Sequence, residues 1–89
     1  MTKTTNAITM TVNGQELTFV PNTGDYNKFI NEMAMDNKVA PANNYLRRIV
    51  SKECKEALDS ILELPGSALQ LAEAVNSKYA PKLEIDLKN

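Results

Sequence analysis

Residues 7–20 read AITMTVNGQELTFV, two segments of alternating apolar and polar residues joined by Asn13-Gly14. Both central residues of a type I′ turn need a positive φ, which Asn-Gly adopts with little strain. Closing the chain at this turn places Met10 opposite Leu17, so the apolar residues of both segments share one face. The stretch therefore predicts a β-hairpin. We expect the buried face of this hairpin to consist of Ile8, Met10, Leu17 and Phe19.

Apolar residues at helical spacing follow the hairpin. The first predicted helix is capped by Asn22 or Thr23 and stops at residues 36–38. The second has Pro41 at its first position, where the missing N–H of proline costs no hydrogen bond. Its apolar stripe is expected to face the core and comprises Ala42, Tyr45, Leu46, Ile49 and Val50.

Two further helical patterns follow. Ser51 either caps a third helix or lies within one long helix that joins the second and third. The break Leu64-Pro65-Gly66 separates this pattern from a fourth helix, over about residues 67–78. The sequence therefore predicts three or four helices.

The segment LEIDL, residues 83–87, alternates strictly and predicts a further strand. A lone hairpin is marginal in water, and a third strand with helical cover would make the sheet viable. We expect an α+β fold in which the N-terminal hairpin and the C-terminal strand form a three-stranded sheet, packed with three or four α-helices. Residues 1–89 are expected to form a single domain, with residues 1–6 disordered.

Composition narrows the class of protein. The 89 residues are 43% hydrophobic and 24% charged, close to the globular average. The net charge of −1 lacks the basic excess of a nucleic-acid module. The polar N-terminus predicts no signal peptide, and no stretch approaches the roughly 18 apolar residues of a membrane span. A single cysteine allows no internal disulfide, so we expect a cytoplasmic protein.

No enzymatic chemistry is predicted. The absence of histidine removes the commonest general base and the commonest zinc ligand. Cys54 lies on an apolar stripe and is expected to be a small buried hydrophobe. The isolated glycines form no phosphate-binding loop, and the acidic residues of the third helix have the spacing of a solvated face. We therefore expect no catalytic residue, no metal site and no cofactor.

The fourth predicted helix has few polar residues in its middle. A helix that is apolar around much of its circumference should be buried on more than one side. Either it is a central core helix, or its surplus apolar surface binds a partner or a second copy. On the second interpretation, the candidate partner-binding residues are Leu69, Leu71 and Val75, with the flexible side chains of Met33 and Met35 nearby.

An alternative function is a small nucleic-acid-binding regulator that uses Arg47 and Arg48. Residues 42–62 match a helix-turn-helix in outline. Glu53, Glu56 and Asp59 on the helix that would read the bases would repel phosphates, which argues against this alternative.

The order of the segments resembles a family of tail assembly chaperones from tailed phages and prophages. The resemblance covers about residues 8–87 and rests on overall pattern rather than on a catalytic signature. It is carried by ITMTVNGQELTF (8–19), DYNKFIN (25–31), NKVAPA (37–42), KEAL (55–58), PGSALQLA (65–72) and YAPKLEI (79–85).

The resemblance implies a non-enzymatic role. Such chaperones bind the long, largely helical tape measure protein, keep its apolar stretches from aggregating, and help recruit tail tube subunits around it. It also implies self-association, because an oligomer would cover the apolar surface until a client arrives. No residue roles are carried over from the family, so the candidate residues above come from the apolar pattern alone.

Overall fold

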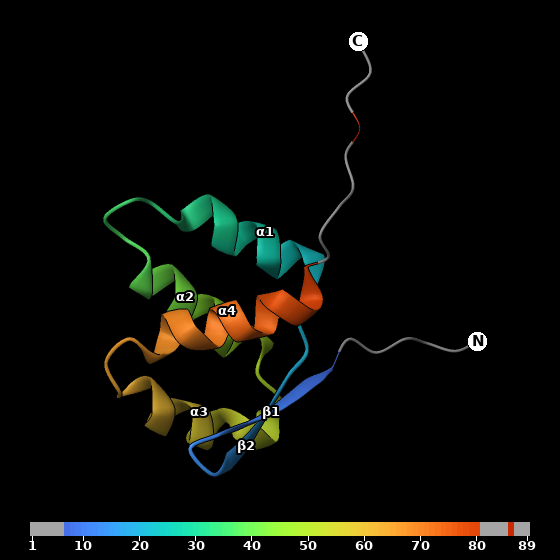
Figure 1. The fold of residues 1–89 in the computed structure, drawn as a ribbon, viewed down its shortest axis with the longest axis vertical. Coiled ribbons are helices and arrows are strands. Elements are labelled where there is room, and N and C mark those ends of the chain that lie inside the picture. The colour runs from blue at the N-terminus through green and yellow to red at the C-terminus, as the bar shows by residue number, and fades with distance from the viewer. Residues whose placement is uncertain (1–6, 81–85, 87–89) are drawn as a thin grey trace, which may run out of the picture.

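The computed structural model describes residues 7–80 and Asp86. Within them the fold is α+β, with four α-helices and one two-stranded antiparallel sheet (Figure 1). The elements, in order, are β1 (Ile8–Val12), β2 (Gln15–Phe19), α1 (Thr23–Glu32), α2 (Val39–Ile49), the short 3₁₀ turn η1 (Lys52–Cys54), α3 (Lys55–Leu62) and α4 (Ser67–Tyr79).

The predicted hairpin is confirmed, including its register. Met10 lies opposite Leu17, and both turn residues, Asn13 and Gly14, have positive φ. Of the four residues expected to be buried, Leu17 and Phe19 are fully covered. Ile8 and Met10 are only partly buried. The difference arises because β2 is the inner strand and β1 the outer one.

The edge of β2 that faces away from β1 pairs with residues 49–51, which join α2 to η1. Val20 donates its N–H to the carbonyl of Ile49 at 2.7 Å, and Ser51 donates to the carbonyl of Thr18 at 2.9 Å. Phe19 and Val50 form an isolated β-bridge between these bonds. The link between two helices thus gives the hairpin support that we had expected from a third strand.

A three-stranded sheet is not observed in the described part of the chain, where the sheet order is β1–β2. The strand predicted at 83–87 lies, apart from Asp86, outside the described residues. The predicted disorder of residues 1–6 also lies outside them.

The structure confirms the predicted starts of the first and fourth helices. Asn22 caps α1, because its side-chain Oδ1 accepts the N–H of Asp25 at 2.8 Å. The second helix begins at Val39, two residues before the predicted start at Pro41. The second and third helices are separate, since Val50 has an extended backbone with ψ of 145°. This break lets residues 49–51 pair with β2, and a continuous helix would have used those backbone groups internally.

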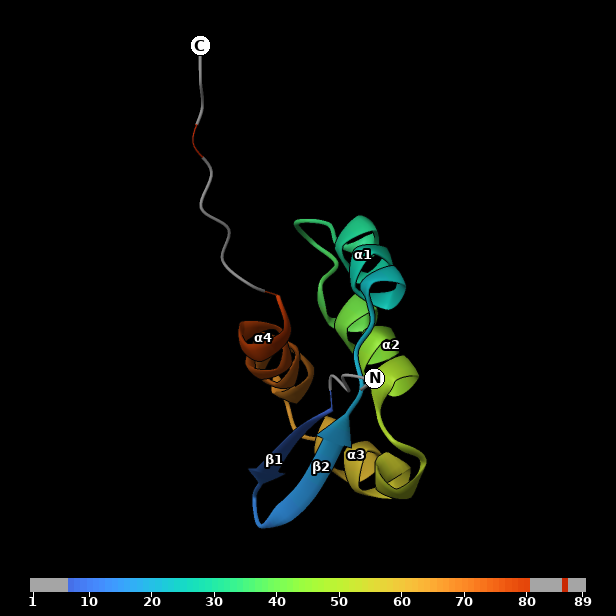
Figure 2. The same cartoon turned by 90° about the vertical axis from the view of Figure 1, so that its right-hand side faces the viewer.

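The helix α2 lies at the centre and contacts α1, α3 and α4, while the hairpin packs beside α3 (Figure 2). All five residues of its predicted stripe are buried. Tyr45 is fully covered and joins three helices. Its ring stacks on Phe29 of α1 at a centroid distance of 4.7 Å, and its hydroxyl donates to Oδ1 of Asn76 on α4 at 2.8 Å.

The fourth helix is buried on one side, not on several as its composition suggested. Its covered face consists of Ser67, Ala68, Leu71, Ala72 and Val75. Leu69 lies outside this covered face and is exposed. The small side chains of Ala68 and Ala72 lie on this covered face, where short side chains permit close approach of a neighbouring helix, and α4 contacts both α2 and α3.

Two substitutions to Asp on α4 test this assignment of faces. Val75→Asp places a charge in the core and should lower the free energy of unfolding by at least about 3 kcal/mol. Leu69→Asp lies on the exposed face in the first helical turn, where an anion is tolerated, and should change it by less than about 0.5 kcal/mol. Urea denaturation measures both. Equal losses of unfolding free energy in the two variants would show that the buried face of α4 is assigned incorrectly.

The pKa of Tyr45 generates a second prediction. Burial of the ring, reinforced by the neighbouring Tyr79, Tyr26 and Asp25, raises the pKa of Tyr45 from 10.0 to about 12. The folded state therefore disfavours the phenolate, so this contribution to stability is complete below pH 10 and is lost as the pH rises towards 12.

The control is Tyr45→Phe, which keeps the ring and removes the ionisable hydroxyl. We expect this variant to cost about 1 kcal/mol at neutral pH, because the bond to Asn76 is lost. The stability advantage of the wild type should shrink between pH 10 and 12, as measured by denaturation at each pH. If the difference in unfolding free energy between the wild type and Tyr45→Phe stayed constant from pH 10 to 12, the account would be contradicted.

Candidate functional site

The structure divides the five predicted partner-binding residues into two groups. Leu71 and Val75 are 5% and 0% exposed and lie in the core, so they form no part of the monomer surface. Leu69 and Met35 are 38% and 92% exposed. Met33 is partly buried and packs against the core. The five residues therefore do not form one surface, because Leu71 and Val75 belong to the face of α4 that packs on α2.

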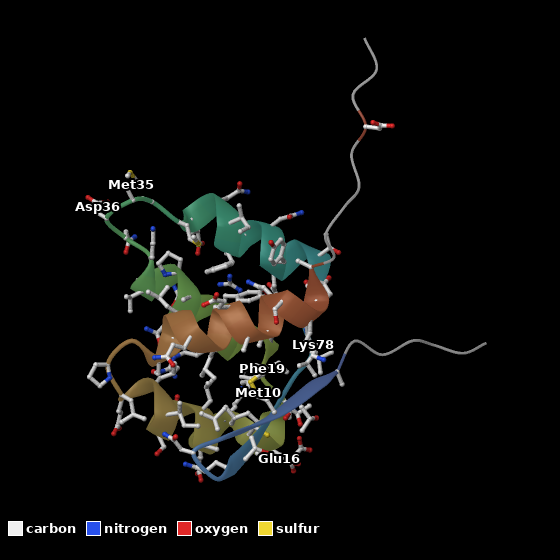
Figure 3. All side chains as sticks on the ribbon, viewed as in Figure 1. Met10, Glu16, Phe19, Met35, Asp36 and Lys78 are labelled. Carbon is white, nitrogen blue, oxygen red and sulfur yellow. The ribbon has the colours of Figure 1, made fainter. Side chains whose placement is uncertain are left out.

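Met35 is held at the tip of a defined turn between α1 and α2. Ala34 and Asn37 exchange two backbone hydrogen bonds, each 3.1 Å long, which close a two-residue turn. Met35 and Asp36 occupy its tip and extend away from the helices (Figure 3). Because the turn is closed by its own backbone, it does not depend on a contact from Met35, whose thioether is free to meet a partner.

A second exposed apolar corner lies between α3 and α4. Leu64 continues the end of α3, with its N–H bonded to the carbonyl of Ile61 at 2.9 Å, and is 46% exposed. Gly66 then adopts a φ of 75°, which reverses the chain into α4. Leu69 follows in the first turn of that helix. Two exposed leucines thus flank this reversal, five residues apart in the sequence.

These elements lie on the same side of the molecule. Figure 1 shows the α1–α2 turn, the start of α2, the α3–α4 corner and the start of α4 along one side. Val39, the first residue of α2, is 52% exposed. We call this region the loop-side surface and define it as Met35, Val39, Leu64 and Leu69.

Sequence reasoning missed Val39 and Leu64. Both are apolar residues next to a helix end and outside the buried stripe of that helix. Each follows a charged residue, Lys38 or Glu63, which was available as a signal of exposure, but local sequence gives no indication that the two residues share one side of the fold.

A hollow of about 230 Å³ borders the loop-side surface at Leu64. Its walls combine apolar side chains with three polar ones, and Ser67 Oγ within it is buried without a hydrogen-bond partner among the described residues. A partner group entering this hollow would have to satisfy the Ser67 hydroxyl as well as cover the apolar walls. It is lined by Val12, Asn13, Ile61, Leu64, Pro65, Ser67, Gln70 and Leu71.

The two arginines considered for nucleic-acid binding are each paired with an aspartate from another helix. Arg47 on α2 bonds Asp59 on α3. Arg48 Nε lies 3.2 Å from Asp25 Oδ1 on α1. These pairs join α2 to its neighbours, and the partner carboxylates reduce the positive potential that phosphate binding requires.

Other kinds of site find little support in the part of the chain that the structure describes. It contains no group of three or more His, Cys, Asp or Glu side chains placed to hold a metal ion. None of its helices combines the length and apolar character needed to cross a membrane. Cys54 is partly buried, and its thiol lies 3.7 Å from the carbonyl of Glu16, so it contributes to the contact between η1 and β2.

The chain is 38% identical over 84 residues to an uncharacterized 11.3 kDa protein from the lys 3′ region of Haemophilus phage HP1, covering 94% of this chain and 82% of that protein. No solved structure matches it. A family model described as phage tail assembly chaperone matches residues 8–89. The chain belongs to the phage tail assembly chaperone family.

Proposed function

We propose that this chain binds apolar helical segments of the tape measure protein and so assists assembly of the tail tube. The observation that carries the proposal is the match of residues 8–89 to the tail assembly chaperone family. The loop-side surface supports it, because its exposed apolar side chains are the kind of feature that marks protein-binding sites.

The proposed contact is hydrophobic and adaptable. An amphipathic helix of the client would lay its apolar face across Met35, Val39 and Leu69. The flexible thioether of Met35 would adjust to different client side chains, which suits a chaperone that meets many segments of a long protein. With few large anchors, each contact would be weak, so the chaperone could leave before the tail is complete.

The same surface supports self-association before a client binds. We propose a homo-oligomer in which the loop-side surface is covered by another copy, in the bacterial cytoplasm where the client is made. Release of that contact would expose the surface to the tape measure protein and allow tail tube subunits to be recruited around it. The role is binding, and it requires no catalytic group.

Co-expression with the tape measure protein encoded in the same genome tests the proposal. The wild-type chain should raise the soluble fraction of the client and elute with it in size-exclusion chromatography with light scattering. In the double variant Met35→Ser/Leu69→Ser, loss of two exposed apolar contacts should weaken client binding by at least about tenfold, or about 1.4 kcal/mol. The free energy of unfolding should change by less than about 1 kcal/mol.

Val20→Ser is the matched control. Val20 is 47% exposed, similar to the residues tested, but lies between β2 and α1, outside the loop-side surface. This variant should bind the client like the wild type. A double variant that still solubilises the client would show that the surface is assigned incorrectly. A wild-type chain that elutes alone while the client stays insoluble would contradict the proposed function itself.

A further inference from the structure

The hollow beside Leu64 is enclosed by three parts of the chain. One wall is the tip of the hairpin, a second is the end of α3 with Leu64 and Pro65, and the third is the start of α4. Local geometry fixes these walls. Asn13 and Gly14 hold the positive φ values of the hairpin turn, and the Ser67 N–H donates to the Leu64 carbonyl at 3.2 Å. The hollow is therefore formed by the folded chain itself, as most binding pockets are.

Ser67 provides a polar group that the fold leaves unused. The residue is 8% exposed, and its Oγ has no hydrogen-bond partner among the described residues. A buried polar group without a partner costs stability, and an occupant that bonds it removes that cost. Rotation about the Cα–Cβ bond of Ser67 lets the hydroxyl meet such a group in the hollow. The hollow therefore favours an occupant that carries a hydrogen-bonding group.

The lining selects a neutral occupant with a large apolar body. None of the eight described lining residues is charged, so a charged side chain would lose its hydration without an ion pair in return. Five of the eight are apolar, and a purely aliphatic side chain would cover these but leave the Ser67 hydroxyl unbonded. A tyrosine side chain has both an apolar ring and a hydroxyl that donates and accepts. Because a cavity of about 150 Å³ is enough to bind benzene, a hollow of about 230 Å³ accommodates this ring.

The three tyrosines of this chain are already engaged elsewhere. The ring of Tyr26 packs edge-on against Tyr45 and Tyr79, with centroid distances of 6.3 and 6.1 Å. Tyr45 is fully buried, and the Tyr79 hydroxyl lies 3.2 Å from Thr23 Oγ1. This cluster joins α1, α2 and α4, and none of its rings lines the hollow. A second copy would have to break the cluster to fill the hollow, so the fitting occupant comes from a different protein.

We propose that this hollow receives a tyrosine side chain of the bound client helix, with the tyrosine hydroxyl bonded to Ser67. The inference rests on the proposed function, in which the client is a helix of the tape measure protein. Leu64 belongs both to the loop-side surface and to the wall of the hollow, so a helix on that surface can place one side chain inside. The exposed apolar residues accept many helices, whereas the hollow selects the segments that carry tyrosine.

Titration of the whole chain with phenol, followed by NMR, tests the hollow without the client. Phenol carries the ring and hydroxyl of tyrosine, and benzene is the matched probe without the hydroxyl. Phenol should shift the signals of Val12, Ser67 and Gln70. The ratio of phenol affinity to benzene affinity should fall at least about fivefold in Ser67→Ala, which should remain folded because it loses only an unbonded hydroxyl. Ser60→Ala removes an exposed hydroxyl of α3 outside the hollow and should leave the ratio unchanged.

A tyrosine-containing helical segment of the tape measure protein tests the occupant. Its Tyr→Phe form should bind the wild-type chain at least about fivefold more weakly, whereas Ser67→Ala should bind both forms equally. Equal binding of both forms to the wild type would overturn the proposal but not the proposed function, and so would a phenol-to-benzene ratio that Ser67→Ala leaves unchanged. A wild-type chain that binds phenol but no client segment would contradict the proposed function, and with it the client as the source of the tyrosine.

Discussion

Two backbone hydrogen bonds between β2 and the link that follows α2 determine the arrangement of the rest of the structure. They join Val20 to Ile49 and Ser51 to Thr18. To make them, the chain must leave the helical conformation at Val50, which separates α2 from α3 and turns α3 alongside the hairpin. The same pairing makes β2 the inner strand and β1 the outer one. It also lets Phe19 and Val50 enter the core side by side.

Around this junction, buried aromatic contacts fix the helices that carry the loop-side surface. Tyr45 stacks on Phe29 of α1 and bonds Asn76 of α4, so both helices are positioned by one residue of α2. The ion pair of Arg48 with Asp25 adds a partly buried contact between α2 and α1. The turn that carries Met35 and the corner that carries Leu64 therefore lie at the ends of well-packed helices. Apolar side chains can be exposed there without loosening the core.

The predictions that succeeded depend on local signals. Asn13-Gly14 and the alternation beside it specify both the turn and the register of the hairpin, and the stripe of α2 specifies its buried face. The end of α2 could not be predicted, because it depends on hydrogen bonds that the Ile49 carbonyl and the Ser51 N–H make with a segment distant in the sequence. The sequence left the buried face of α4 undecided for a similar reason. Leu69, Leu71 and Val75 are equally apolar, and only the position of α2 decides which of them are covered.

The central claim is that a folded chain offers the loop-side surface to an apolar helix of the tape measure protein. Hydrogen–deuterium exchange by mass spectrometry, with and without a client segment, tests it most directly. We predict slower exchange over residues 33–39 and 63–69 on binding, with α2 residues 42–49 and β2 unchanged. Protection elsewhere with none in these two segments, or faster exchange throughout α2, would contradict the claim.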